Sequence, residues 1–175
     1  MNIEFIDLTE VQKDVVHCYA HRTDNEKKNM EQRQKETLIE HTELCQQYYE
    51  KIVEYKQIQV VFERFEKLYF SEMSREGIHF FETMRDNVIT FHDIGKINPR
   101  FQENNMGNYE LKGKARPDNS VGSKHSILSS VLYLDYFLNR VSQIENLEER
   151  KSLRDLAYIH SFLIAKHHGA LTDFQ

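Results

Sequence analysis

The sequence carries side chains that bind transition metals at four separate places. They are His41, the pair His92 and Asp93, His125, and the pair His167 and His168. Imidazole nitrogen and carboxylate oxygen together suit manganese, iron, cobalt, nickel or zinc, whereas magnesium prefers a shell of oxygen. Any one of these histidines has an ordinary explanation, such as a core hydrogen bond or a favourable cation at a helix C-terminus. As a set they predict a metal site, because buried imidazoles and carboxylates without partners would destabilise the fold.

Hydrophobic periodicity predicts that these side chains lie on an all-α fold, a single helical bundle with the histidines near the ends of its elements. The expected helices cover residues 7–20, 37–55, 60–69, 81–93, 124–141 and 147–168. Thr37 and Glu40 have the spacing of a capping box, which places His41 in the first turns of the second helix. Ser123 is expected to cap the helix that carries His125.

Apolar side chains at three-and-four spacing predict which helix faces are buried. On the helices over 37–55 and 60–69 the predicted faces comprise Leu38, Cys45, Tyr48, Tyr49, Ile52, Tyr55, Val60, Val61, Phe65, Leu68 and Tyr69. His160 is expected in the core, with a supporting role beside His167 as the alternative. Ser126 and Ser129 pack beside His125 or line its site. The remaining histidines are interpreted as structural or surface groups, and these are His17, His21 and His79.

The chain after Asp93 is expected to turn and then to open into a loop. Gly95 suits a backbone turn, and Pro99 prevents the preceding helix from continuing. Residues 103–123 form a long polar stretch that is predicted to be a basic loop. Its candidate strand-binding cations are Lys112, Lys114, Arg116 and Lys124, with Phe101 and Tyr109 as candidate stacking surfaces. For any single lysine, a solvated loop charge remains the simpler interpretation.

The composition limits the classes of function. A formal net charge of −5 argues against a general electrostatic grip on nucleic acid, but it allows a local basic strip beside bound cations. No apolar stretch approaches the length needed to span a membrane, and no secretory leader is recognised. Cys18 and Cys45 lack paired spacing, so reduced thiols that pack between helices are expected. These features predict a soluble cytoplasmic protein without a membrane partner.

Four separated motifs resemble one known family. "LIEHT", "FHDIGK" followed by "NPRFQ", "KHSILSS" and "IAKHHGALTD" occur in the order found in HD-superfamily phosphohydrolases. They are most similar to the HD nuclease domain of the CRISPR type I effector nuclease-helicase. The resemblance covers about residues 36–173 of a single domain over 1–175, and no helicase domain is expected in this sequence.

The resemblance implies a centre with two divalent ions and Asp93 as the shared ligand. His41 and His92 would join Asp93 on one ion, and three histidines would join it on the other, namely His125, His167 and His168. Lys96 would meet phosphate or orient the nucleophile, while a solvated side chain after a helix is nearly as good an interpretation from the sequence alone. Asp93 and Lys96 are therefore the candidate catalytic residues.

The function implied is hydrolysis of single-stranded DNA by metal-activated water in CRISPR interference, an antiviral defence. The implied partners are the effector complex and a helicase domain in the same or another chain. In this family a further aspartate beyond "HHG" completes the first metal shell. Asp173 is poorly placed for that role, so a C-terminally truncated domain is expected. The alternatives are a phosphohydrolase of nucleotides or cyclic nucleotides, and a catalytically incomplete docking fragment.

Overall fold

The computed structural model describes residues 3–22, 35–111, 113 and 124–169. Its elements are α1 Leu8–Val11, η1 Lys13–His17, β1 Tyr19–Arg22, β2 Lys35–Thr37, α2 Leu38–Tyr55, α3 Gln59–Tyr69, α4 Arg75–Asp86, α5 Val88–Phe91, η3 Ile94–Ile97, α6 Pro99–Met106, α7 His125–Val141 and α8 Leu147–Lys166. The predicted all-α class is confirmed, since the sheet found in these ranges is a single two-stranded antiparallel pair of β1 and β2. No helix in the described ranges is long and apolar enough to cross a membrane.

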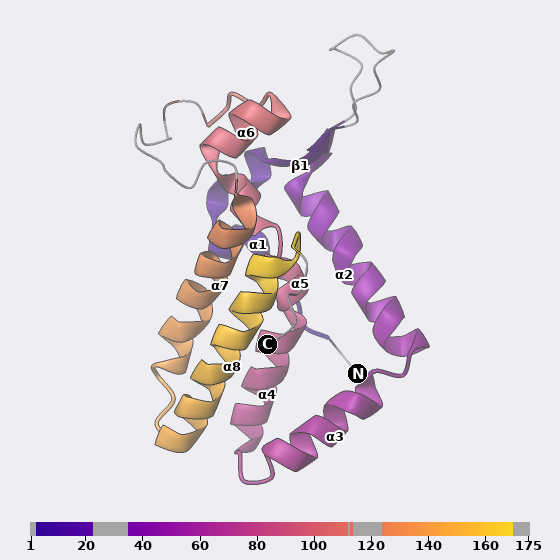
Figure 1. Ribbon diagram of the computed structural model, residues 1–175, viewed down its shortest axis with the longest axis vertical. Coiled ribbons are helices and arrows are strands. Elements are labelled where there is room, and N and C mark those ends of the chain that lie inside the picture. The colour runs from indigo at the N-terminus through magenta and orange to yellow at the C-terminus, as the bar shows by residue number, and fades with distance from the viewer. Residues whose placement is uncertain (1–2, 23–34, 112, 114–123, 170–175) are drawn as a thin grey trace.

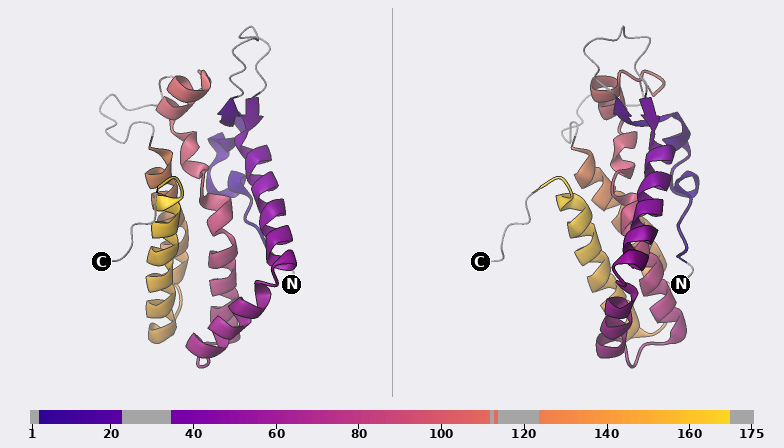
Figure 2. Two further views of the ribbon diagram at one scale, coloured as in Figure 1. Left: turned by 45° about the vertical axis from the view of Figure 1, so that its right-hand side comes forward. Right: turned by 90° about the vertical axis from the view of Figure 1, so that its right-hand side faces the viewer.

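The four long helices α2, α4, α7 and α8 run roughly along the long axis of the molecule, as Figure 2 shows. In Figure 1, α7 and α8 form a side-by-side pair, α4 lies behind them, and α2 slants away on the opposite side. The short elements α5 and η3 continue from the end of α4 and pack on α7. The histidine-bearing ends of α2, α7 and α8 thereby meet around the α5–η3 segment.

An aromatic core holds the α4, α7 and α8 helices together. Phe91, Tyr133 and Phe137 are almost completely buried, and their ring centroids lie 4.6–5.7 Å apart. The Tyr133 hydroxyl donates to the Met84 carbonyl at 2.9 Å and lies 2.9 Å from His160 Nδ1. His160 is therefore a hydrogen-bonded core residue, as the simpler interpretation of the sequence expected.

The helix expected over residues 7–20 ends at Val11 instead. The Asp7 carboxylate caps α1 by accepting from the Thr9 N–H, but Gln12 has extended backbone and the chain continues as η1 and then β1. Tertiary hydrogen bonds hold this alternative, because the Gln102 amide accepts from Tyr19 N–H and donates to Tyr19 C=O, each at 2.9 Å. A partner more than eighty residues away overrides the local helical pattern.

The helix expected over residues 81–93 is interrupted at Asn87. The Asn87 side chain accepts from Ile6 N–H at 2.8 Å and donates to the carbonyls of Glu4 and Thr83. These bonds fasten the N-terminal segment to the bundle, and the chain after Asn87 runs as the single turn α5. The break changes the direction in which His92 and Asp93 leave the helix.

The faces predicted to be buried on α2 and α3 are largely exposed in the described chain. Leu38 is fully buried, but Tyr48, Ile52 and Tyr55 are 57%, 51% and 81% exposed. On α3 no residue is fully buried. Instead, a polar network joins these helices to α4, because the Arg85 guanidinium contacts Asp86 and Glu66 and the Tyr49 hydroxyl donates to Asp86 at 2.7 Å.

Gly95 and Pro99 have roles in addition to those predicted. A Cβ on Gly95 would lie 2.0 Å from the His125 carbonyl oxygen and 2.6 Å from the Ser129 nitrogen, so glycine allows η3 to approach α7 closely. The Ser129 hydroxyl accepts from the Gly95 N–H at 2.8 Å rather than contacting the His125 ring. Pro99 is the first residue of α6, where its missing N–H is harmless, so the segment expected to be loop begins as a helix.

Candidate metal centre

The structure brings all six predicted metal-binding side chains together, with the five histidines around the Asp93 carboxylate. Oxygen Oδ2 lies 3.1 Å from His41 Nε2 and 3.5 Å from His92 Nε2. Oxygen Oδ1 lies 3.2, 3.1 and 3.8 Å from the Nε2 atoms of His125, His167 and His168. The Asp93 side chain is only 4% exposed. One buried carboxylate therefore divides the histidines into a group of two and a group of three.

Each histidine is placed by the end of an element. His41 lies in the first turns of α2, which begins with the predicted capping box of Thr37 and Glu40. His125 is the first residue of α7, and His167 is the C-cap residue of α8. His92 and Asp93 lie in the link between α5 and η3. Because these element ends lie close together, the histidine side chains reach one point, the Asp93 carboxylate.

The second ring nitrogens fix the orientation of the site. His92 Nδ1 lies 2.5 Å from the Ile89 carbonyl oxygen, and His167 Nδ1 lies 2.6 Å from that of Ile164. A carbonyl oxygen only accepts, so both rings carry a proton on Nδ1 and, when neutral, present the Nε2 lone pair toward Asp93. His41 Nδ1 lies 3.4 Å from the Glu36 carboxylate. This arrangement is typical of imidazoles that bind metal through Nε2.

The electrostatics of the site favour an ionised Asp93. Burial alone would raise the pKa of its carboxyl group, but contacts with His125, His167 and His41 hold that pKa well below its ordinary value. Burial lowers the pKa of His92, as it does that of His168. For His167, burial also lowers the pKa, but the contacts with Asp93 and the Ile164 carbonyl outweigh it and raise the pKa.

The donor set fits divalent transition-metal ions. A neutral His92 or His167 would point a lone pair at a carboxylate oxygen, and two acceptors repel each other unless a positive charge lies between them. His125 Nε2 and His168 Nε2 also lie only 2.8 Å apart. Protons or bound cations can satisfy these contacts, and the imidazole and carboxylate ligands match manganese, iron, cobalt, nickel or zinc.

Lys96 is buried beside Asp93 rather than solvated. Its Nζ lies 2.7 Å from Asp93 Oδ2, and its side chain is 3% exposed. The same nitrogen lies 3.5 Å from His21 Nε2. The lysine thus supplies a positive charge at the half of the site that faces His41 and His92. Its predicted contact with phosphate stays a prediction.

Two further side chains also lie at the site, although the sequence had suggested other roles for them. His21, taken as a structural or surface group, comes from β1, and its ring centroid lies 4.7 Å from that of His41. Cys45, taken as a packing residue, has its Sγ 3.7 Å from His41 Nε2. The four-residue spacing from His41 to Cys45 could have indicated this contact. The position of His21 could not be foreseen, because it depends on the β1–β2 pairing.

The predicted strand-binding residues are only partly described. Lys112, Lys114 and Arg116 lie outside the described residues, as does Asp173. Lys124 is exposed and directly precedes α7. Tyr109 is 59% exposed and its stacking role stays a prediction, but Phe101 is only 5% exposed. Its ring packs at 5.0 Å on the His125 ring, so the prediction that Phe101 stacks on a base is wrong and it supports a histidine instead.

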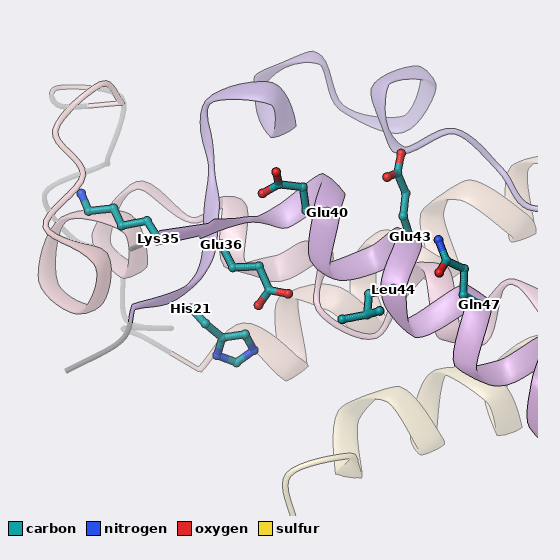
Figure 3. A pocket seen from close by; sticks show the side chains of 7 residues that line it. All are labelled: His21, Lys35, Glu36, Glu40, Glu43, Leu44 and Gln47. Carbon is teal, nitrogen blue, oxygen red and sulfur yellow. The ribbon is translucent and has the colours of Figure 1, made fainter. Parts of the chain in front are cut away.

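A pocket of about 640 Å³ adjoins the His41 side of the centre. Figure 3 shows His21, Lys35 and Glu36 from the two strands and further residues from α2 around it, namely Glu40, Glu43, Leu44 and Gln47. Three carboxylates in this lining disfavour a phosphate backbone there. On the other side of Asp93, the side chain of His168 is 58% exposed.

Helical elements that converge on one His-Asp pair define the class of HD-type metal-dependent hydrolase domains. A family model described as "Cas3, HD domain" matches residues 26–175, and the chain belongs to this family. The resemblance seen in the motifs is thereby confirmed, and with it a metal-dependent nuclease domain of CRISPR interference. No curated protein and no solved structure gives a significant match.

Proposed function

We propose that this domain hydrolyses the phosphodiester bonds of single-stranded DNA during type I CRISPR interference. One observation carries the proposal: the single buried carboxylate of Asp93 has imidazole nitrogens on both oxygens, two on one side and three on the other. A shared carboxylate of this kind suits two ions a few ångströms apart, which is the arrangement used for in-line displacement at phosphorus. The count of two ions is part of the proposal.

The residues of this chain have separable roles in that chemistry. Divalent ions bound here would lower the pKa of a water molecule toward neutrality and stabilise charge on the scissile phosphate. His41 and His92 would bind on one side of Asp93, with His125, His167 and His168 on the other. The carbonyls of Ile89 and Ile164 keep two of the rings in the binding tautomer. No covalent intermediate with the protein is required.

Lys96 has the geometry of a charge-balancing group. Its ammonium contacts Asp93 Oδ2, and cations bound by His41 and His92 would compete with it for that oxygen. We propose that the displaced ammonium then contacts a non-bridging phosphate oxygen, which is the role the motif implies. Its short distance from Asp93 keeps it within reach of any phosphate held at the centre.

The substrate strand is proposed to approach past His168 and Lys124. Lys124 is exposed immediately before His125, and the acidic pocket on the opposite side disfavours phosphate. We propose that Lys112, Lys114 and Arg116 extend this path. The effector complex and a helicase domain are the proposed partners, in the cytoplasm, where free thiols such as Cys18 and Cys45 stay reduced.

The proposal is tested by giving the protein manganese and a panel of labelled single-stranded DNA, duplex DNA, single-stranded RNA, nucleotides and cyclic nucleotides. We expect cleavage of single-stranded DNA, and no detectable cleavage by Asp93→Asn or His125→Gln at unchanged helicity. The matched control is His79→Gln, because the His79 side chain is 68% exposed and lies on α4 beside Glu82, away from the Asp93 carboxylate. Turnover of nucleotides with intact DNA would show that the domain is a nucleotide phosphohydrolase instead.

A further inference from the structure

Cys45 lies among the metal-binding side chains without a role in the chemistry described so far. It is half-buried on α2, one turn after His41, with Sγ 3.7 Å from His41 Nε2. Ligand atoms of His41, Cys45 and His92 all lie within 4.8 Å of one another. These three residues form a cluster of two nitrogens and one sulfur on the Oδ2 side of Asp93.

The separation of Cys45 from His41, and those of His41 and His92 from Asp93, are close to the separations of ligands that share one ion. With zinc–nitrogen bonds of about 2.0–2.1 Å and zinc–sulfur bonds of about 2.3 Å, tetrahedral ligands lie roughly 3.3 Å apart for two nitrogens and roughly 3.6 Å for nitrogen and sulfur. The Cys45–His41 separation is 3.7 Å, and Asp93 Oδ2 lies 3.1 and 3.5 Å from His41 and His92. Side-chain adjustments would close the remaining separations, which are at most 4.8 Å within the cluster.

We propose that Cys45 is a metal ligand together with His41 and His92, and that this half of the centre selects a thiophilic divalent cation such as zinc or cobalt over manganese. Soft thiolate sulfur favours these metals, while manganese prefers oxygen. On metal binding, the Cys45 thiol would lose its proton to solvent as the sulfur–metal bond forms. The inference rests on the metal centre of the proposed function, but it requires no cleavage of DNA.

Cobalt titration of the protein tests the ligand directly. Thiolate bound to Co²⁺ gives a strong charge-transfer absorption in the near ultraviolet, which imidazole and carboxylate do not give. We expect this band in the native protein and its loss in Cys45→Ser, while weaker visible bands persist from cobalt on His125, His167 and His168. The control Cys18→Ser should keep the band, because the Cys18 thiol is buried elsewhere and donates to the Asp14 carbonyl at 3.3 Å.

Two further measurements make the test independent of folding and of nuclease activity. X-ray absorption of the zinc-loaded native protein should show a sulfur scatterer at about 2.3 Å, whether or not Cys45→Ser folds. Zinc affinity should fall at least about tenfold in Cys45→Ser with manganese affinity unchanged. Cobalt binding without the thiolate band, or a band that survives Cys45→Ser, would overturn the assignment. Cobalt ligation by sulfur in a protein that cleaves no DNA would contradict the proposed function alone.

Discussion

The Asp93 carboxylate is buried in the fold, and nitrogen atoms of other side chains surround it. Five imidazole nitrogens and one ammonium lie within 3.8 Å of its two oxygens. A buried carboxylate is costly unless it is paired, and the ring nitrogens are poor partners unless they carry protons or share bound cations. Lys96 is the one permanent cation among them. It therefore stabilises Asp93 most when no metal is bound.

We predict that Lys96→Met destabilises the metal-free protein far more than the metal-loaded one. Both side chains of the Lys96–Asp93 pair are almost fully buried, and removal of one partner from such a pair costs roughly 3–5 kcal/mol. Bound cations would replace the lost positive charge. Urea unfolding with a chelator and with saturating manganese measures the difference.

The surface variant Lys151→Met is the matched control, since Lys151 is exposed on α8 and should show no such dependence on metal. An equal loss of stability with chelator and with manganese would mean that Lys96 acts through packing alone.

At the scale of elements, the site depends on how closely η3 approaches the first turn of α7. Gly95 makes this approach possible, and its N–H donates to the Ser129 side-chain hydroxyl, which joins η3 to α7. His125, the first residue of α7, lies at this contact. Because Gly95 has no side chain, it sets the position of the first turn of α7, and with it the position of His125.

Gly95→Ala is accordingly predicted to weaken both the fold and the His125 side of the centre. The added methyl group would meet backbone atoms at 2.0 and 2.6 Å, so α7 must shift, at a cost of about 1–3 kcal/mol. Isothermal titration with manganese should show reduced affinity or the loss of one site. Gly169→Ala is the control, because its Cβ would meet the Lys166 carbonyl oxygen at an ordinary 3.5 Å. Unchanged metal binding in Gly95→Ala would contradict this role.

The sequence could predict several of the helices and six candidate ligands that the fold brings together, but not their environment. Periodicity located α7 and α8 well, and residue type alone marked the His-Asp pair. Periodicity predicted the wrong burial on α2. An apolar stripe such as Tyr48, Ile52 and Tyr55 shows which residues share a helix face, but not whether another element covers that face. The Asn87 break and the contact of His21 with Lys96 could not be read either, since both depend on segments distant in the chain.

For the molecule as a whole, the site and the core are two separate links, and both join α7 to α8. The metal centre joins the ends of α2, α7 and α8 to the α5–η3 segment. Deeper in the bundle, Tyr133 joins α7 to the Met84 carbonyl of α4 and to His160 of α8. The second link contains no metal ligand, so its contribution to stability can be measured without the centre.

His160 gives this link a dependence on pH. Burial, with the nearby Arg85 charge, lowers the pKa of His160 to about 4, against an ordinary value of 6.5. The unfolded chain therefore binds the His160 proton more readily than the folded one between these two values. The stability from a neutral His160 is complete above pH 6.5 and is lost as the pH falls toward 4. The loss amounts to about 3 kcal/mol at the bottom of this window.

The prediction is measured as a difference between two proteins, so that contributions common to both cancel. His160→Asn keeps a short side chain with a donor for the Tyr133 hydroxyl but has no proton to gain. Free energies of unfolding in urea, taken with chelator at intervals from pH 7.5 to pH 4, should fall more steeply for the native protein than for His160→Asn. The two curves should converge as the pH falls, because the variant escapes the proton-linked loss. Parallel curves would show that His160 carries its proton equally in the folded and unfolded chains, and that the Tyr133 link is insensitive to pH.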